Sequence, residues 1–570
     1  MVIFVYPVYS VPRRRDLWEY LTQLGASITS PWIVLRDFNC FLFPQHKRVG
    51  QVLIAYLLHG LKEFVMATSL VDAPSSGSFY TWTNGSLWPK LDRPQRGSRS
   101  FKFYNMWLTH PSFAEVRDSL WETEIRGTAQ YVLCGKLKLL KKPLRKLNRD
   151  EFGGISDKTS RAKEAFKVTI ILQMATPIDS ALKEEAERTF FRQKARCTHL
   201  VEGGRSTKYF HAMVNKNKQK NSISYLVKFD VTRTTSKEEV ATLLVDFFTR
   251  LMGIAYPSSP IDLDVLRVGP LVGMDSHTTL GAPVSDEEIR WALFDIGDER
   301  APSPDGFTAA FFKANWDIVR EDVVKAVREF YTMGRLLRQL NHTIIALIPK
   351  IDRDPGVGDF RPIGCANVVY KIITKILAKR MEALLSSLID RSQGAFIRGR
   401  SLVNDVFLAQ EIVRGYSVAR TFAWCMLMMD LRKAYDTVSW EFLEAVLRGL
   451  DFPKVFVGWV IECVTTASYS VSINGEMHGH FPGRRGLRQG DPMSSALFLL
   501  CLEYFSRICR ARAASPSFAF HPMCGEVGIT HIAFVDDLML FLQGGYLFNG
   551  YFLGLLISFG AMFWTCSQSC

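Results

Sequence analysis

The stretch "AFVDDLMLF", from Ala533 to Phe541, sets two aspartates side by side inside an otherwise apolar run. Ionised carboxylates repel each other and are costly to remove from water, so the core of an ordinary β-strand excludes them. A lone pair of this kind commonly lies at the exposed turn of a hairpin. Asp536 and Asp537 therefore indicate either an exposed turn or a site at which a cation offsets their charge.

A second apolar run, "CMLMMDLRKAYDTVSW" (425–440), ends its strand-like part at Asp430 and continues as an expected helix. If that strand lies beside the hairpin of Asp536 and Asp537, three carboxylates converge, and only cations make the arrangement tolerable. Mg²⁺ fits, because this hard ion binds a few carboxylates and fills its other positions with water and phosphate oxygens. Two such ions about 3.5–4 Å apart serve in-line phosphoryl transfer. The pattern therefore predicts two Mg²⁺ ions here, with Mn²⁺ as the alternative ion.

The composition indicates the kind of partner. A chain of 570 residues has room for several domains, and its net charge of +14 suits a polyanion, either nucleic acid or an anionic membrane surface. The 11 cysteines form no C-x-x-C pair, which argues against a zinc site and favours a reducing, intracellular compartment. At the N-terminus the apolar run precedes the basic cluster, the reverse of a secretory signal, so we expect no export. The nucleus and the cytoplasm both remain open.

The chain divides into regions that differ in composition and in expected secondary structure. Residues 1–100 alternate short strand-like runs with loops, and residues 101–280 are rich in expected helices. From 281 to 545, helical patterns alternate with strand-like runs. Ser285 with Glu288 is typical of a capping box that begins a helix at 286, and another helix is expected to begin near Thr308.

Basic patches recur in the second region. The stretch "KLKLLKKPLRKLNR" (136–149) holds seven Lys or Arg, and "FRQKAR" and "KNKQK" repeat the bias. An isolated run of this kind is usually a solvated helix face. The repetition makes a surface that contacts nucleic acid an equal alternative.

Seven segments of the third region occur in a characteristic order. Together they resemble the reverse transcriptase domain of LINE-type (non-LTR) retrotransposons, of the kind abundant in plant genomes. The segments are "VSDEEIRWALFDIGDERAPSPDGFTAAFFKANW", "LNHTIIALIPK", "FRPI", "QGAFIRGRSLVNDV", "MDLRKAYDTVSW", "GLRQGDPMSSALF" and "FVDDLMLF".

The resemblance implies an α+β fold, a right-hand polymerase with fingers and palm over residues 281–545. It implies that Asp430, Asp536 and Asp537 hold the metal ions, and that Tyr435 packs under the incoming sugar and excludes a 2′-hydroxyl. Lys350 and Arg361 are expected to contact the triphosphate, where Arg suits bidentate contacts. Gln489 and Gly490 are expected near the nucleotide and template. For Lys350, Arg361, Tyr435, Gln489 and Gly490 a purely structural role is the alternative. Such a role would be a surface ion pair, a core aromatic or a turn glycine.

The activity expected from the resemblance is RNA-directed DNA polymerisation: transfer of dNTPs to a primer 3′-hydroxyl on an RNA template. Val535 stands where LINE enzymes usually have alanine, although reverse transcriptases more broadly accept larger apolar residues there. The second hypothesis is an inactive relic that at most binds nucleic acid. A group II intron-type maturase is a third, which the first region and the absence of a maturase segment argue against.

The first region resembles part of the endonuclease/exonuclease/phosphatase family, an α/β sandwich. In "PWIVLRDFNC" (31–40), Asp37 and Asn39 correspond to residues that orient a water for phosphodiester cleavage. However, Arg36 replaces a glycine, and neither the metal-binding glutamate nor an S-D-H segment with its catalytic histidine is present. We therefore expect a degenerate nuclease remnant. Residues 101–280 resemble the basic helical linker of the same elements, with His211 structural.

The end of the chain departs from the family pattern near Gln543. Residues 546–570 are uncharged and mostly apolar, which a hydropathy rule reads as a membrane helix. No Lys or Arg flank follows, so we expect instead a truncated or frame-shifted end that lacks the thumb. No membrane partner is expected.

Overall fold

The protein is described by a computed structural model that divides into two compact units, residues 1–99 and 100–570. In the first unit, strands β1 (Val2–Phe4) and β2 (Ile33–Leu35) pair in parallel. The predicted nuclease residues Asp37 and Asn39, His211 and the tail 546–570 lie outside the described residues. The described residues are 2–4, 19–20, 22–24, 33–35, 101–152, 217, 220–256, 260–351, 354–414, 424–431, 433–516, 518–521 and 523–543.

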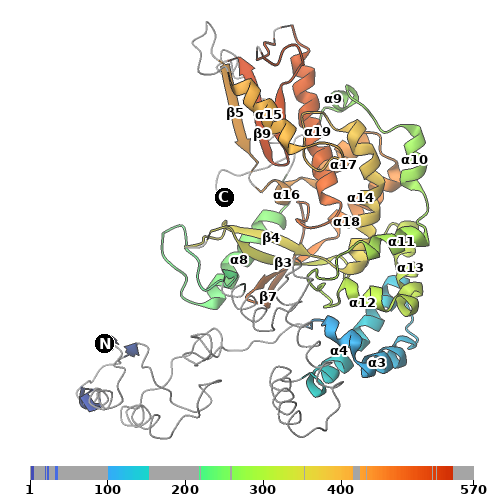
Figure 1. Ribbon diagram of the computed structural model, residues 1–570, viewed down its shortest axis with the longest axis vertical. Helices are drawn as coiled ribbons and strands as arrows, with labels where there is room; N and C mark the ends of the chain where they lie inside the picture. Colours follow the sequence, from blue (N-terminus) through green and yellow to red (C-terminus); the bar gives the residue numbers. More distant parts are fainter. Residues whose placement is uncertain are drawn as a thin grey trace, which may run out of the picture. The chain divides into compact units, whose positions relative to one another are not determined.

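A four-stranded sheet lies in the middle of the second unit as drawn in Figure 1. Its strands follow the order β4-β3-β6-β7, in which β3 runs parallel to β6 and the other pairs are antiparallel. Helix α8 (Lys237–Met252) packs on this sheet through Leu244 and Phe248, which are fully buried. The strands are β3 (His342–Pro349), β4 (Phe360–Cys365), β6 (Ser468–Ile473) and β7 (Glu476–Pro482).

A three-stranded antiparallel sheet carries the two predicted carboxylate segments. Its order is β5-β9-β8, with β5 (Trp424–Asp430), β8 (His531–Phe534) and β9 (Asp537–Gln543). Val535 and Asp536 form the turn between β8 and β9, because Phe534 and Asp537 are the last paired residues of that hairpin. The prediction of a strand ending at Asp430 and of a hairpin turn at the aspartate pair is therefore confirmed.

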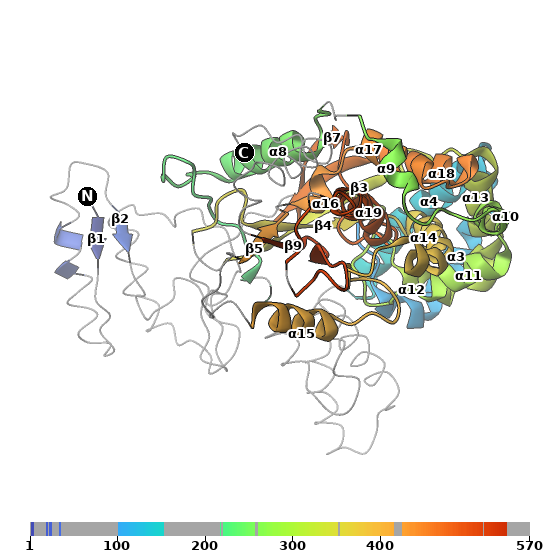
Figure 2. The ribbon, with the colours of Figure 1, turned by 90° about the horizontal axis from the view of Figure 1, so that it is seen from above.

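The helices surround the sheets and provide most of the core. Figure 1 draws α14, α17 and α18 to one side of the sheets, and Figure 2, seen from above, shows α15 at an edge, apart from that group. The remaining bounds are η2 (Asn105–Thr109), α3 (Pro111–Trp121), α4 (Ala129–Asp150), α9 (Leu263–Arg267), α10 (Met274–Gly281), α11 (Asp286–Phe294), α12 (Ala309–Ala314), α13 (Trp316–Met333), α14 (Val368–Leu388), α15 (Leu402–Val413), α16 (Ala434–Thr437), α17 (Trp440–Gly449), α18 (Lys454–Thr465) and α19 (Ser494–Ala513).

Helix α19 is the central element of the core. It is apolar around most of its circumference, the pattern of a helix covered on all sides. Leu497, Phe498, Leu499, Leu500 and Cys501 are each fully buried, and the helix packs against α14 and α17. Helix α19 follows directly after the "RQGDP" loop. Because the core holds α19 in place, the end of that loop is held in place too.

Two helix starts follow the predicted capping signals. Ser285 accepts a hydrogen bond from the Glu288 N–H (3.2 Å), and the Glu288 carboxylate accepts one from the Ser285 N–H (3.1 Å). This capping box begins α11 at Asp286. Thr308 caps α12, which begins at Ala309. Both predictions are confirmed.

The basic stretch 136–149 lies on α4. One stripe of the helix is buried against α3 and α13 and consists of five leucines and Gln130, whereas the other face is exposed and cationic. The exposed cations are Lys138, Lys142, Arg145, Lys146 and Arg149. Among the described helices, none is both long and apolar enough to cross a membrane.

Candidate active site

Asp430 and Asp537 face each other across strands β5 and β9, where they are paired in register. The Leu431 N–H donates to the Asp536 carbonyl oxygen at 3.0 Å, so the neighbouring 430–537 pair occupies a non-hydrogen-bonded position. At such a position the Cα atoms lie about 4.5 Å apart and the side chains are close. Asp536 immediately precedes Asp537 in the turn, so the strand register brings the three predicted carboxylates together.

The carboxylates raise one another's free energy. Asp430 and Asp537 are exposed, whereas Asp536 is half-buried. Burial raises the pKa of Asp536, the charges of Asp537 and Asp430 raise it further, and Arg361 opposes the shift. A cation beside Asp536 would remove this penalty.

The donor chemistry fits a hard divalent cation. Carboxylate oxygens are the protein ligands of Mg²⁺, which takes only one or two carboxylates and completes its shell with water and phosphate oxygens. Among the described residues, no group of three or more His, Cys, Asp or Glu side chains could hold a metal ion, and this includes the three aspartates as they stand. An ion at this corner would therefore take one or two of these carboxylates and complete its shell with water and substrate phosphate oxygens.

The turn that carries Asp536 is locally strained. Val535 adopts a left-handed conformation with φ of 57°. For a β-branched residue this conformation is unfavourable, by about 1–3 kcal/mol, and it persists only where neighbouring contacts fix it. Val535, which stands where LINE enzymes usually have alanine, is therefore the most constrained residue of the turn.

A cleft of about 1150 Å³ opens beside this turn. Six of the predicted site residues line it, whereas Asp430 and Asp537 are not among the lining residues. The lining residues that the sequence predicted are Lys350, Arg361, Tyr435, Gln489, Gly490 and Asp536.

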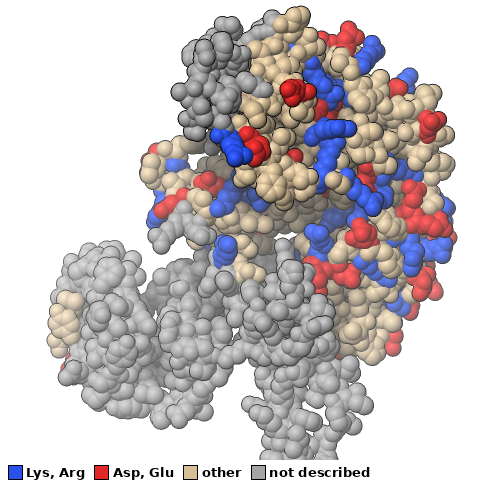
Figure 3. All heavy atoms as spheres, turned by 45° about the horizontal axis from the view of Figure 1, so that its top comes forward, with Lys and Arg blue, Asp and Glu red and all other residues tan. Residues whose placement is uncertain are grey.

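The cleft has additional cations that the sequence analysis did not identify. Lys371, Lys375 and Lys379 of α14 all line it, together with Arg300. Figure 3 shows Lys and Arg side chains interspersed with Asp and Glu over the visible face of the protein. The spacing of four residues in "KIITKILAK" could have revealed the row, because residues four apart share one helix face. Lys375 also forms an ion pair with Asp295, so part of the charge is already neutralised.

Tyr435 presents a fixed aromatic surface to the cleft. Its ring stacks on Phe498 with the centroids 4.5 Å apart and the planes 16° from parallel. Burial raises the pKa of the Tyr435 hydroxyl, so the group stays neutral at ordinary pH. Because Phe498 belongs to the buried helix α19, the ring is held from below by the core.

The "RQGDP" loop is anchored by buried polar groups. Arg488 is buried, donates to the Cys463 carbonyl oxygen (3.2 Å) and lies over the Tyr370 ring (4.2 Å). The Tyr370 hydroxyl donates to Asp491 at 2.5 Å. Between these anchors, the Gly364 N–H of β4 donates to the Gln489 carbonyl oxygen at 2.8 Å. The loop is thereby fixed at the floor of the cleft.

Gly490 is required by its backbone conformation. Its φ is +100°, which side-chain-bearing residues rarely adopt, while an added Cβ would meet its nearest neighbour only at 3.5 Å. The expectation that a small residue here permits close approach to the nucleotide and template stays a prediction. The glycine is needed to turn the loop.

Asp436 is a second group to which the sequence analysis assigned no role. It is buried, lines the cleft, and accepts hydrogen bonds from Gln489 Nε2 at 3.3 Å to each carboxylate oxygen. Burial raises the pKa of Asp436 to about 7, although Lys433, Gln489 and Lys350 favour the charged form. No sequence signal distinguished it from an ordinary helix-surface acid.

A family match identifies the domain that contains this site. Residues 348–547 match the family described as "Reverse transcriptase (RNA-dependent DNA polymerase)". This range contains all eight predicted polymerase residues, from Lys350 to Asp537. The chain therefore carries a reverse transcriptase domain, within a mixed α/β fold.

Proteins of retrotransposons are among the relatives of this chain, in agreement with the sequence resemblance. The chain is 25% identical over 362 residues to the "Transposon TX1 uncharacterized 149 kDa protein" of Xenopus laevis, covering 63% of this chain and 27% of that protein. It is 24% identical over 303 residues to the "Retrovirus-related Pol polyprotein from type-2 retrotransposable element R2DM" of Drosophila melanogaster, covering 53% and 26%. A third relative, the Pol polyprotein of a type-1 R2 element of Nasonia vitripennis, is 26% identical over 270 residues, covering 46% and 24%. The chain thus spans about a quarter of the length of each of these relatives.

Proposed function

We propose that this chain is an RNA-directed DNA polymerase that adds deoxynucleotides to a primer 3′-hydroxyl along an RNA template. The observation that carries the proposal is the pairing of Asp430 with Asp537 beside Asp536, at the edge of a cleft lined with cations. The retrotransposon relatives support the same reaction. In the proposed fold, a right-hand polymerase, the three-stranded sheet belongs to the palm, and β3 and β4 belong to the fingers.

Asp430, Asp536 and Asp537 are the proposed ligands of the divalent ions. Two Mg²⁺ ions bound there would activate the primer hydroxyl and neutralise the leaving pyrophosphate. Asp430 and Asp537 are suited to this task because they lie on adjacent strands whose register is set by backbone hydrogen bonds, and Asp536 lies in the tight turn directly before Asp537. Their positions therefore do not depend on flexible loops.

The cations around the cleft are the proposed triphosphate contacts. Arg361 is paired in register with Ile348 of β3, and Lys350 follows that strand directly, so both lie at one end of the two-stranded ribbon. The effect of Arg361 on the pKa of Asp536 supports its nearness to the carboxylates. An Arg there can bind two phosphate oxygens at once, while Lys350 contributes a single charge.

Tyr435 is the proposed contact of the incoming sugar. A ring fixed by Phe498 leaves no room to adjust to an additional 2′-oxygen. Gln489, whose amide is held by Asp436, is the proposed neighbour of the base pair being formed. These roles extend the resemblance residue by residue to this chain.

The remaining regions have subordinate roles in the proposal. Residues 1–100 are the proposed nuclease remnant of a plant-type element, and the basic face of α4 adds a contact for RNA. The competing function is a relic that binds nucleic acid without copying it. The basic surface alone would support the relic equally well, whereas the carboxylate geometry favours the polymerase.

Primer extension tests the two functions against each other. The full chain is incubated with poly-rA/oligo-dT, dTTP and Mg²⁺, and compared with Asp536→Asn. The polymerase predicts dTTP-dependent extension that disappears in the variant while RNA binding on filters persists. Filter binding without extension by the wild type would favour the relic.

A further inference from the structure

The segment between α14 and α15 forms an additional edge beside the carboxylate hairpin. Gln393 pairs in parallel with Ala533 of β8. The Ala533 N–H donates to the Ser392 carbonyl oxygen (2.8 Å), and the Gly394 N–H donates to the Ala533 carbonyl oxygen (3.0 Å). Strand β8 therefore has a hydrogen-bonded neighbour on both sides. The contact between this segment and β8 lies next to the turn that carries Asp536.

The Gln393 side chain reaches the turn itself. It is 2% exposed, and its Oε1 accepts hydrogen bonds from the Ala395 N–H (3.0 Å) and from the Val535 N–H (3.3 Å). Both partners are donors, so only the carbonyl oxygen can face them. The Gln393 Nε2 atom is buried without a hydrogen-bond partner among the described residues. The amide is thus oriented for its contact with Val535.

Val535 is the residue of the turn that most needs an external contact. Its left-handed conformation is one that persists only where the surroundings fix it. The backbone N–H bound by Gln393 belongs to this residue, one position before Asp536. A change in the Val535 conformation would change the direction of both carboxylates, because Asp536 and Asp537 follow it directly in the chain.

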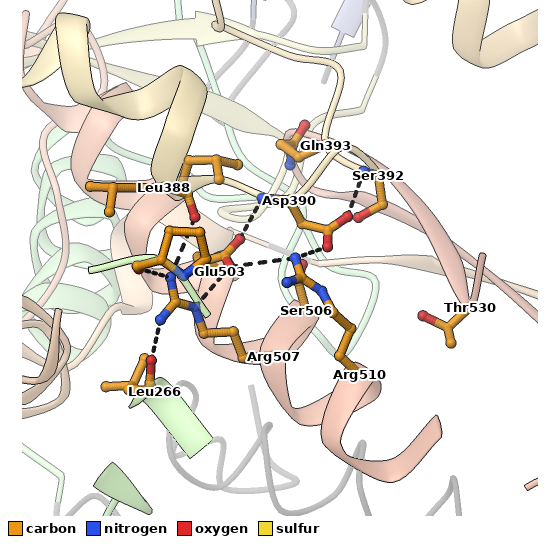
Figure 4. Close-up of polar contacts among 12 residues, drawn as sticks. Leu266, Leu388, Asp390, Ser392, Gln393, Glu503, Ser506, Arg507, Arg510 and Thr530 are labelled. Carbon is orange, nitrogen blue, oxygen red and sulfur yellow. Dashed lines mark hydrogen bonds and ion pairs between the residues drawn. The ribbon is translucent and has the colours of Figure 1, made fainter. Parts of the chain in front are cut away.

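The Gln393 segment is itself anchored to the core helix α19. Figure 4 shows Asp390 between Glu503 and Arg510 of that helix. The Asp390 N–H donates to the Glu503 carboxylate at 2.7 Å, and Asp390 forms an ion pair with Arg510. From the other side, Arg400 donates to the Gln393 carbonyl oxygen at 2.7 Å. The acceptor presented to Val535 is therefore held in place by part-buried contacts to α19 and Arg400.

We propose that Gln393 is a positioning residue for the carboxylate turn, which it holds through the Val535 N–H. This role matters for catalysis only if the proposed function is correct, since Gln393 would position the same carboxylates. Its geometry is nevertheless independent of catalysis. Gln393 lies in the segment "QGAFIRGRSLVNDV", to which the proposed mechanism otherwise assigns no role.

Amide hydrogen exchange of the full chain tests the contact directly. Gln393→Met removes the acceptor at nearly unchanged volume, and Gln393→Glu retains an acceptor oxygen. Ser392→Ala is the matched control, because it removes a part-buried hydrogen bond of the same segment, to His531 Nε2 at 2.8 Å, without touching the turn. We expect exchange of the Val535 amide to rise about tenfold in Gln393→Met, the effect of one lost hydrogen bond. Ser392→Ala and Gln393→Glu should stay near the wild-type rate.

A second readout connects the contact to the carboxylates. In primer extension, the Mn²⁺ concentration for half-maximal rate should rise several-fold in Gln393→Met, with the KM for dTTP unchanged. Unchanged Val535 exchange in Gln393→Met, or an equal increase in Ser392→Ala, would overturn the inference. If Gln393→Met does not fold, the wild type alone is measured. A Val535 amide that exchanges there as fast as an unprotected amide would also overturn the inference. A wild type without polymerase activity but with the expected exchange pattern would refute the proposed function and support the positioning role.

Discussion

Asp430 and Asp537 are directly opposite each other on neighbouring antiparallel strands, in a pair whose side chains share one face of the sheet. Like charges at such a position are destabilising, by roughly 0.2–1 kcal/mol. The neighbouring pairs between β5 and β9, from Cys425 with Leu542 to Met429 with Leu538, are apolar. The opposed charges thus lower the stability of the folded state, and they concentrate negative charge at one corner of the sheet.

The first prediction follows from this repulsion. Asp430→Asn should raise the free energy of unfolding by about 0.2–1 kcal/mol in the absence of divalent ions, because it removes one of two opposed charges. The same variant should lose primer extension. Chemical denaturation with and without Mg²⁺ measures the first effect. If the variant is less stable than the wild type in metal-free buffer, the carboxylates do not repel each other as described.

The second prediction concerns the choice of sugar. Tyr435→Val should increase incorporation of ribonucleotides relative to deoxynucleotides by about tenfold or more, because the ring that fills the space of the 2′-oxygen is removed. Tyr435→Phe keeps the stacked ring on Phe498 and should keep the discrimination. The ratio of kcat/KM for dTTP and UTP is the measurement. Equal ratios in all three proteins would exclude Tyr435 as the contact of the sugar.

The third prediction is a pH dependence of stability. Burial raises the pKa of Asp436 from 3.8 to about 7, so the folded state holds a proton that the unfolded state has released between these values. Raising the pH from 4 to 7 should therefore weaken the wild type relative to Asp436→Asn, by at most about 4 kcal/mol at one pKa unit per 1.36 kcal/mol.

Denaturation curves at several pH values measure this difference. The two proteins should differ least near pH 4, where Asp436 is protonated in the folded state, and most above pH 7. Parallel stability profiles across this range would show that Asp436 titrates in the same way in both states.

The fourth prediction compares two Glu–Arg pairs with the same spacing. Glu503 and Arg507 of α19 are fully buried with a 2.8 Å contact, whereas Glu444 and Arg448 of α17 form an exposed pair at 2.6 Å. Arg507→Met should lower the free energy of unfolding by about 3–5 kcal/mol, because it leaves a buried charge without its partner. Arg448→Met should lower it by about 0.3–0.5 kcal/mol. Thermal melting of both variants checks the contrast, which equal effects would contradict.

Much of the carboxylate corner could be predicted from the sequence. The apolar run before Asp430 and the aspartate pair inside "AFVDDLMLF" contain the signals of strands and of a turn, and both predictions agree with β5, β8 and β9. The cap at Ser285 depends on four consecutive residues, and such local patterns can be read from a sequence without knowledge of the tertiary fold.

The supporting contacts could not be predicted in the same way. Gln393 contacts Val535 across a long stretch of sequence, and no local pattern records that pairing. The burial of Asp436 depends on the loop around Gly486, whose added Cβ would meet the Asp436 carbonyl oxygen at 2.5 Å. The positive φ of Gly490 was likewise not predicted, and it adds a conformational reason for glycine beside the predicted approach of a ligand. These features arise from tertiary packing, which a single sequence does not specify.

Binding of Mn²⁺ to the full chain tests the central claim most directly. Electron paramagnetic resonance of Mn²⁺ in the presence of template, primer and a non-hydrolysable dNTP counts the bound ions. The account predicts two ions per wild-type chain and a loss of Mn²⁺ binding in Asp430→Asn, Asp536→Asn and Asp537→Asn. Undiminished binding in all three variants would contradict it.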